Sequence, residues 1–361
     1  MKELPPFVSN PIKTEGHFAV GIKGSGKSAL GENIAATHYR HRYIICDLLD
    51  GNDFEAAFWG IPGSKGGCYP TLLVHPPWYE VTLKNGMFSH IKPISSEEGL
   101  KKILKIAKQE RRIVTMACKL WRRGTVGNLL KEWLFDLPDI TSRVKSRIFV
   151  LMREVGSYAF SQLKIFPELE DEFRRALVYL FRESRHHEIS FFFDAHRLVD
   201  LHRSIRVLCD RSHIKLSSRE MIPNEKQWVF QEIKSWREKF ARKAWKTRET
   251  LYPRIQKLWA REFYGVGPFE ELRPVYKFQM APFRHKRPSD VFEDITGFHF
   301  KYDATKEEEF VRQNEMKKAP KKELIYIAML QNPGATDGEI ARRVDCSRPY
   351  VTQIRNAIRT A

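Results

Sequence analysis

The sequence predicts an α/β protein with a mostly parallel central sheet, followed by a small all-α domain. Two observations predict the α/β part. Short apolar runs alternate with helical patterns over residues 15–220, and a glycine-rich loop joins the first run to the first helix. A third observation predicts the all-α part, because three short amphipathic segments follow one another between residues 320 and 361.

The α/β region is predicted from runs of alternating character. Each expected strand is a run of three to six mostly apolar residues: 17–20, 43–46, 72–74, 113–118, 147–152, 189–193 and 213–216. Helical patterns fall between several of these runs, at 29–39, 126–137 and 168–183. Because helical stretches separate many of the runs, the strands are expected to pair in parallel around one core.

Residues 21–28 read Gly-Ile-Lys-Gly-Ser-Gly-Lys-Ser, which matches the G-x-x-x-x-G-K-S pattern of a phosphate-binding loop. An apolar run precedes the loop and a helical pattern follows it, which is the context that the pattern needs. Backbone N–H groups of such a loop point at phosphates, and those expected to do so belong to Gly21, Gly24, Ser25 and Gly26. Lys27 is expected to reach the β- and γ-phosphates, and the Ser28 hydroxyl to bind Mg²⁺.

The loop therefore predicts a P-loop NTPase with a RecA-like parallel sheet that binds ATP or GTP, and we take ATP as the expected nucleotide. The alternative is an ordinary glycine-rich turn before a helix. A turn of that kind would bind no nucleotide. The complete pattern, in the expected strand–loop–helix context, favours the phosphate-binding loop instead.

Length and composition bound the class of protein. At 361 residues the chain can form a large α/β domain and a smaller one, and its 42% hydrophobic residues fit a soluble globular protein. The sequence has no apolar run of about 18 residues and no apolar leader after Met1, so we expect a cytoplasmic protein without a membrane anchor. The five cysteines are scattered without metal-ligand spacing, which predicts neither a disulfide framework nor a zinc site.

The net charge of +18 at pH 7 predicts a polyanionic partner. In a cytoplasm the main polyanions are nucleic acids, so we expect double-stranded DNA or another nucleic acid to bind this chain. A generally basic surface without such a partner is the alternative.

Changes in texture divide the chain into four segments. They are a nucleotide-binding core, a basic helical arm with an irregular segment, a charged linker and a DNA-binding domain, at residues 1–222, 223–303, 304–319 and 320–361. In the arm, one helical face carries Val229, Ile233, Trp236 and Phe240. This face favours packing on the core, and contact with DNA phosphates is the alternative.

A site that hydrolyses ATP needs an acidic group at the end of a neighbouring strand, to hold Mg²⁺ and to orient the attacking water. Two predicted strands can supply one. The strand at 147–152 leads into Arg153 and Glu154, and the strand at 189–193 leads into Asp194. The residues themselves leave both assignments open.

Residues 185–197 read Arg-His-His-Glu-Ile-Ser-Phe-Phe-Phe-Asp-Ala-His-Arg, which resembles the R-x-x-G-I-x-L-x-x-A-T-Q-R segment of the FtsK-HerA superfamily of DNA-pumping ATPases. The strand before Glu154 resembles the hydrophobic Walker B strand of that superfamily, and the motifs follow the family order over residues 15–216. The resemblance implies that Glu154 is the catalytic glutamate and that His196 replaces the sensor glutamine. It also implies a homo-oligomeric ring, a hexamer in the family, in which Arg185 reaches the nucleotide of the neighbouring subunit. Arg182 is a rival for that role.

One residue departs from the family pattern, because Arg153 stands where the family has an aspartate. A cation beside Mg²⁺ is unfavourable unless it points away or pairs with a carboxylate. Mg²⁺ then relies on Ser28, waters and Glu154, or another acid helps. The candidates for that acid are Asp47 and Asp194, and Asp194 is also the alternative Walker B acid. A further alternative is a site that binds ATP and hydrolyses it poorly.

Residues 320–361 predict a helix-turn-helix or winged-helix domain. A first helix buries Leu324, Ile327, Ala328 and Leu330. Thr336 is expected to cap a second helix, with Glu339 as its capping-box partner. Ser347 is expected to cap a third helix, whose buried stripe is Val351, Ile354 and Ile358.

A third helix in a major groove would present polar side chains to phosphates and base edges. The expected contacts are Ser347, Arg348, Tyr350, Thr352, Gln353 and Arg355. A small bundle that docks a protein is the alternative.

These patterns together predict an ATP-dependent motor that moves duplex DNA, in packaging, mobilisation or processing. The alternative is of another class: a nucleotide-switched DNA-binding regulator or replication initiator with weak ATPase activity.

Overall fold

The computed structural model describes residues 9–21, 26–49, 69–83, 90–116, 120–121, 123–153, 155, 167–196, 209–214, 262–266, 276–277, 298–318, 325, 328–329, 332–344 and 346–359. The chain forms two compact units, which are described separately. The first comprises residues 1–76 and 81–300, and the second comprises residues 77–80 and 301–361.

The first unit contains a sheet with the strand order β11-β10-β9-β1-β8-β7-β2-β6-β3-β5. Its strands are β1 Gly16–Val20, β2 Ile44–Leu49, β3 Thr71–His75, β5 Ile91–Ser95, β6 Ile113–Met116, β7 Ile148–Met152, β8 Ile189–Ala195, β9 Arg211–Ile214, β10 Glu262–Val266 and β11 Tyr276–Lys277. The eight strands from β9 to β5 pair in parallel, and β10 and β11 add antiparallel pairs at one edge. The predicted α/β class with a mostly parallel sheet is therefore confirmed.

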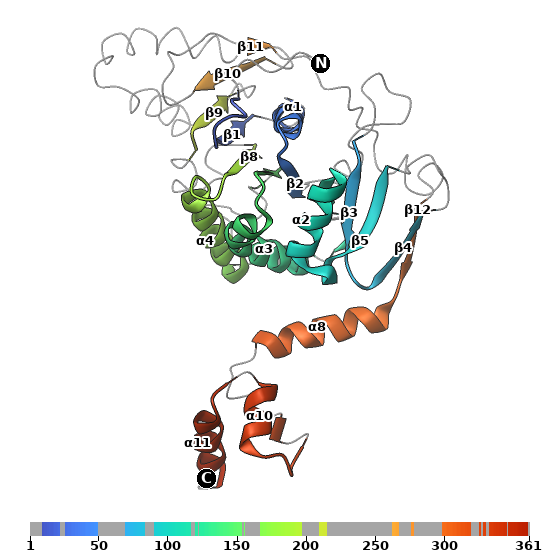
Figure 1. The fold of residues 1–361 in the computed structure, drawn as a ribbon, viewed down its shortest axis with the longest axis vertical. Coiled ribbons are helices and arrows are strands. Elements are labelled where there is room, and N and C mark those ends of the chain that lie inside the picture. The colour runs from blue at the N-terminus through green and yellow to red at the C-terminus, as the bar shows by residue number, and fades with distance from the viewer. Residues whose placement is uncertain are drawn as a thin grey trace, which may run out of the picture. The chain divides into compact units, whose positions relative to one another are not determined.

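Within the described residues of this unit, four helices accompany the sheet (Figure 1): α1 Lys27–Arg40, α2 Gly99–Glu110, α3 Arg123–Val144 and α4 Pro167–Glu183. The three helices predicted from the sequence correspond to α1, α3 and α4. Each of the seven predicted strands overlaps a strand of the sheet. The sequence did not predict α2, β5, β10 or β11.

The phenylalanines of β8 show which helix covers which face of the sheet. Successive side chains of a strand point to opposite faces. The ring of Phe181 in α4 stacks on Phe191 and Phe193, with centroid distances of 3.9 and 5.3 Å. On the other face, a Cβ atom on Gly31 of α1 would lie 2.6 Å from the ring of Phe192, so the helix needs glycine to approach this closely. Helices α1 and α4 therefore cover opposite faces.

The second unit contains α8 Ala304–Lys318, α10 Asp337–Arg343 and α11 Arg348–Arg359. Strands β4 Tyr79–Leu83 and β12 Phe298–Tyr302 form a separate two-stranded sheet. The predicted charged linker at 304–319 is helical over most of its length. Its Phe310 packs on the buried Trp78, with 5.0 Å between ring centroids, and the Asp303 N–H donates to the Trp78 carbonyl at 2.9 Å.

The C-terminal helices have a small apolar core of their own. Ile325, Ala328, Ile340, Ala341, Val351 and Ile354 are buried together. The predicted capping box is confirmed, since the Thr336 hydroxyl accepts from the Glu339 N–H and the Glu339 carboxylate accepts from the Thr336 N–H. Leu324, Ile327 and Leu330 lie outside the described residues, and a helix-turn-helix arrangement remains a prediction.

None of the helices in the described ranges combines the length and the apolar composition that a bilayer span needs.

Candidate nucleotide site

The two ends of the predicted phosphate-binding loop lie at the carboxyl edge of the sheet. At the end of β1, the Gly21 N–H donates to the Ala195 carbonyl of β8 at 3.3 Å. At the start of α1, Gly26 has φ 92°, a left-handed conformation that glycine adopts readily. Among the described residues, no side chain caps this helix, and its first turn has no acidic residue. Its N–H groups are therefore available to an anion.

Residues 22–25 between these ends lie outside the described residues, and with them the predicted phosphate contacts Gly24 and Ser25. Of the predicted phosphate contacts, Gly21 follows β1 and Gly26 directly precedes α1. Ser28, the predicted Mg²⁺ ligand, is half-buried in the first turn of α1.

Lys27 is buried, with 5% of the residue exposed. Its ammonium donates to the Gly21 carbonyl at 2.7 Å and lies 3.3 Å from Nδ1 of His196. Since an ammonium can only donate, Nδ1 of His196 is the acceptor in this contact. The structure thus brings together two residues that the sequence separates by 169 positions.

His196 reaches the loop because its strand is the direct neighbour of β1. Ala195 of β8 pairs with Val20, and Asp194 pairs with Ala19, so His196 leaves the sheet beside the start of the loop. Asp194, the alternative Walker B acid, is fully buried in β8.

Arg153 lies at the end of β7 with only 2% of the residue exposed. Its Nη1 donates to Oε1 of Glu32 and its Nη2 donates to Oδ2 of Asp47, both at 3.1 Å. The two carboxylates are also buried, so the unfavourable cation at this position is paired within the core. Oδ2 of Asp47, a predicted helper for Mg²⁺, is engaged in this ion pair. Glu154, the predicted catalytic glutamate, lies outside the described residues.

Glu32 was not predicted from the sequence. It lies one helical turn after Ser28, and residues four apart on a helix are neighbours on its surface. The sequence signal that could have indicated Glu32 is its place among the apolar residues Leu30, Ile34 and Ala35. A carboxylate buried there needs a cationic or hydrogen-bonding partner.

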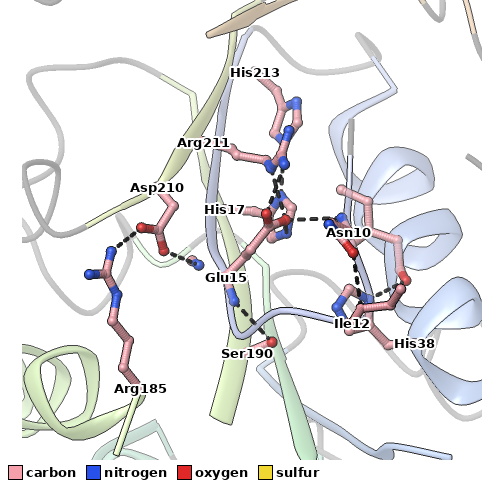
Figure 2. A network of polar contacts seen from close by, with 12 residues as sticks. Asn10, Ile12, Glu15, His17, His38, Arg185, Ser190, Asp210, Arg211 and His213 are labelled. Carbon is pink, nitrogen blue, oxygen red and sulfur yellow. Dashed lines mark hydrogen bonds and ion pairs between the residues drawn. The ribbon is translucent and has the colours of Figure 1, made fainter. Parts of the chain in front are cut away.

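Arg185 lies at the opposite edge of the sheet from the loop. Its guanidinium pairs with Asp210, whose second carboxylate oxygen accepts from the Gly16 N–H at 2.8 Å, at the start of β1 (Figure 2). Five residues of strand separate Gly16 from Gly21, about 16 Å at 3.3 Å per residue. Arg185 is therefore not part of its own chain's loop site. The side chain is 70% exposed, and Arg182, its rival, is exposed on α4.

A buried polar network supports β1 from the amino edge of the sheet (Figure 2). Arg211 of β9 makes two bonds to the Glu15 carboxylate, at 2.8 and 2.7 Å. The imidazoles of His17 and His213 stack in nearly parallel planes, with 3.2 Å between Nδ1 and Nε2. Nδ1 of His38 in α1 donates to the Ile34 carbonyl at 2.9 Å.

These three histidines are neutral near pH 7. Burial, with the nearby charges of His213 and Arg211, holds the pKa of His17 well below 6.5. Burial lowers the pKa of His38 to about 4. Burial and the charge of Arg211 lower the pKa of His213 to about 3. The network thus stabilises the strand that carries the predicted loop, and it lies toward the opposite edge of the sheet from that loop.

The predicted DNA contacts of α11 fall into two groups. Ser347, Arg348, Tyr350 and Gln353 are exposed. Thr352 and Arg355 instead bind Asp337 of α10: the Thr352 hydroxyl donates to Oδ2 at 2.7 Å, and Nε of Arg355 donates to Oδ1 at 2.6 Å. Arg355 also donates to the Ala335 carbonyl at 2.8 Å, so these two side chains hold the helices together.

Comparisons with known proteins give distant structural likenesses only. A scan against protein-family models finds no match, and a search of curated proteins finds none. Among solved structures, the chain is similar to the genome-packaging NTPase B204 of Sulfolobus turreted icosahedral virus 2, at 15% identity and TM-score 0.43, over 74% of this chain and 98% of that one.

Two further likenesses are weaker. The pCW3 conjugation coupling protein TcpA gives 14% identity and TM-score 0.33, over 58% of this chain and 50% of that one. The cytoplasmic domain of the Thermomonospora curvata type VII secretion ATPase EccC gives 14% identity and TM-score 0.31, over 74% of this chain and 25% of that one. These likenesses are too distant to show the chemistry of this chain. Its own residues are the basis for the proposal below.

Proposed function

We propose that this chain is an ATP-dependent motor that moves duplex DNA as a homo-oligomeric ring. The observation that carries the proposal is the position of Lys27. Its buried ammonium lies between the Gly21 carbonyl and His196, at the carboxyl edge of a parallel sheet. Ligands of open α/β sheets bind at this edge.

The residues at the loop fit a nucleoside triphosphate with Mg²⁺. The uncapped start of α1 offers N–H groups to phosphate oxygens, and Lys27 supplies a positive charge beside them. The Ser28 hydroxyl, in the first turn, is the residue that would hold Mg²⁺. Bound with the nucleotide, the metal would neutralise part of the phosphate charge.

Hydrolysis needs a group that orients water, and Glu154 has this role in the proposal. The preceding residue, Arg153, is held by Glu32 and Asp47, which fixes the chain at the point where Glu154 begins. His196 would report on the phosphates, because it already contacts the ammonium that binds them.

An oligomer is proposed because Arg185 is exposed at the edge of the sheet away from its own loop. An arginine there can act on a nucleotide only in a neighbouring copy. A positive charge supplied in this way accelerates phosphoryl transfer by about 10³ to 10⁵ in GTPases. Hydrolysis would then depend on assembly.

Duplex DNA is proposed as the partner on two grounds. The chain carries a net charge of +18, and α11 exposes Arg348, Tyr350 and Gln353. Cationic and amide side chains of this kind contact phosphates and base edges.

The direct test is steady-state ATP hydrolysis with and without saturating duplex DNA, with Lys27→Ala as the inactive control. We expect DNA to stimulate turnover into the range of about 1 to 10³ s⁻¹ that is typical of enzymes. Turnover that stays below about one per minute, far under that range, would exclude a motor.

One observation favours a second function, a nucleotide-switched DNA-binding regulator. Arg153 occupies the place of a metal-binding acid and engages Asp47. A site with fewer free carboxylates binds ATP and hydrolyses it slowly. In that case ATP would change the affinity for DNA, and DNA would leave the rate of hydrolysis unchanged.

A further inference from the structure

Helices α3 and α4 expose a mixed face on the side of the sheet opposite α1. Phe135 of α3 and Tyr179 of α4 contact each other, with 5.7 Å between ring centroids, and they are 40% and 39% exposed. Large aromatic side chains exposed as a pair on packed helices are uncommon away from interfaces.

Charges of opposite sign flank this aromatic pair. On α3, Glu132 and Asp139 lie on the same side as Phe135, at i−3 and i+4. On α4, Arg175 and Arg182 lie on the same side as Tyr179, at i−4 and i+3. All four charged residues are exposed. We call these six residues the α3/α4 face.

The two helices run in the same direction, because later residues of α3 contact later residues of α4. Two contacts between the helices show the register: Lys131 pairs with Glu172, and Phe135 contacts Tyr179. Just beyond the end of α4, Nδ1 of His187 lies 2.9 Å from the Ser142 hydroxyl of α3. The first and last of these contacts join residues 41 and 45 positions apart. Glu132 and Arg175 are 43 positions apart, as are Asp139 and Arg182, so each acid lies level with one arginine.

We propose that the α3/α4 face binds the same face of a second copy of this chain. A two-fold axis parallel to the helices places α3 of each copy opposite α4 of the other, at the same level. Glu132 then faces Arg175 of the second copy and Asp139 faces Arg182, each pair occurring twice. The aromatic pairs of the two copies meet between the ion pairs. The face is self-complementary, which is the requirement for an isologous contact.

The small size of the face indicates a weak contact. At 1.5 Å per residue, α4 is about 25 Å long, and two adjacent helices are about 20 Å wide, which gives a footprint of about 500 Å². Stable interfaces bury about 800 Å² per partner. The contact is therefore weak on its own and dependent on protein concentration. It closes after two copies, so it is distinct from the ring contact proposed above, and it gives Arg182 a role other than that of a finger.

The test is sedimentation velocity of the full chain over a range of concentrations, without DNA or nucleotide. Glu132→Arg places like charges opposite each other twice, and Arg175→Glu does the same, so each should weaken self-association at least tenfold. The double variant Glu132→Arg/Arg175→Glu restores both pairs and should self-associate like the wild type. An equimolar mixture of the two single variants should also associate.

Lys13→Glu and Glu80→Arg, which change exposed charges elsewhere by the same amounts, serve as controls and should have no effect. Circular dichroism checks that each variant folds. The double variant carries both substitutions, so it would not regain self-association if either one prevented folding. Its recovery therefore shows that the single variants fail to associate because of charge. Wild-type self-association that is absent, or that the single variants leave unchanged, would overturn the proposal. So would a double variant as weak as the single ones.

Discussion

Arg153 in the first unit donates to Asp47, with 3.1 Å between Nη2 and Oδ2, and both side chains are buried. The same guanidinium holds Glu32 of α1. One cation thus joins the loop helix to strands β2 and β7. Arg153 directly precedes Glu154, so in the proposed site it would hold the chain next to the predicted catalytic glutamate.

Arg153→Met should destabilise the protein by about 3–5 kcal/mol, because it leaves two carboxylates buried without their cation. Urea unfolding followed by circular dichroism measures the change. Arg147→Met removes an exposed pair with Glu188 and a contact with the Tyr43 ring, and should cost no more than about 1–2 kcal/mol. Adding Glu32→Gln and Asp47→Asn to Arg153→Met should recover much of the loss. Equal effects of Arg153→Met and Arg147→Met would contradict the role of the buried cluster.

Lys27→Ala should abolish tight nucleotide binding while leaving the fold intact. Removing a buried charge partner costs about 2–5 kcal/mol, which is a loss of at least about 30-fold in affinity. Equilibrium binding of a fluorescent ATP analogue measures this loss. His196→Gln keeps a side chain that can accept from the ammonium, so it should bind within a few-fold of the wild type. If Lys27→Ala bound the ATP analogue as tightly as the wild type, the loop would not be the nucleotide-binding site.

Arg185→Ala should lower turnover by about 10³-fold or more if the arginine acts on a neighbouring copy. Mixing Arg185→Ala chains with Lys27→Ala chains should restore part of the activity. Some interfaces in the mixture then combine an intact lysine with an intact arginine. ATPase assays at several mixing ratios measure the recovery. Mixtures as inactive as the separate variants would show that the arginine does not act between copies.

The sheet could be predicted because its central strands are buried on both faces. Strands β1, β3, β6, β7 and β8 are buried along their whole lengths, so they appear in the sequence as short apolar runs. The edge strand β5 is different, because it contains Lys92 and Pro93. Proline is tolerated in an edge strand, where its missing N–H leaves no hydrogen bond of the sheet unmade. Lys92 and Pro93 also interrupt the alternation of apolar and polar residues by which a strand is recognised in a sequence.

From the residues alone, the candidate site and the cap of α10 could be predicted only where the chemistry is local in the sequence. The place of His196 followed from the family resemblance instead. The glycine, lysine and serine pattern of the loop is contiguous, and the Thr336 capping box spans four residues. The partners of Arg153 lie 121 and 106 positions away, at Glu32 and Asp47, so no local pattern indicates them. Long-range ion pairs follow from strand order, which the sequence does not specify directly.

Acid should destabilise the protein through its buried histidines. Their pKa values are lowered in the folded state, to about 4 for His38 and about 3 for His213, so the unfolded chain binds more protons below pH 6.5. Stability should be complete above that pH and fall by about 1.4 kcal/mol per pH unit for each histidine, down to its folded pKa.

Urea unfolding at pH values between 4 and 7 measures this dependence. His38→Phe keeps the ring packing on Tyr43 and Phe149 and removes one titrating group. The slope for this variant should therefore be smaller by the contribution of one histidine. An identical slope in the variant and the wild type would show that His38 does not titrate as its burial requires.

Two arginines of α11 should separate DNA contact from stability. Arg348 is exposed at the start of the helix, whereas Arg355 binds Asp337 and the Ala335 carbonyl. Arg348→Ala should weaken duplex binding and lower its salt dependence by about one phosphate contact, with unfolding unchanged. Arg355→Ala should instead lower the unfolding free energy of the C-terminal helices by about 1 kcal/mol, since it breaks a partly exposed pair. Fluorescence anisotropy of labelled duplex at several salt concentrations, paired with thermal unfolding, distinguishes the two. One arginine is exposed and the other is held by α10, so the two variants should differ. If Arg348→Ala and Arg355→Ala changed DNA binding and stability alike, α11 would have no separate DNA-facing side.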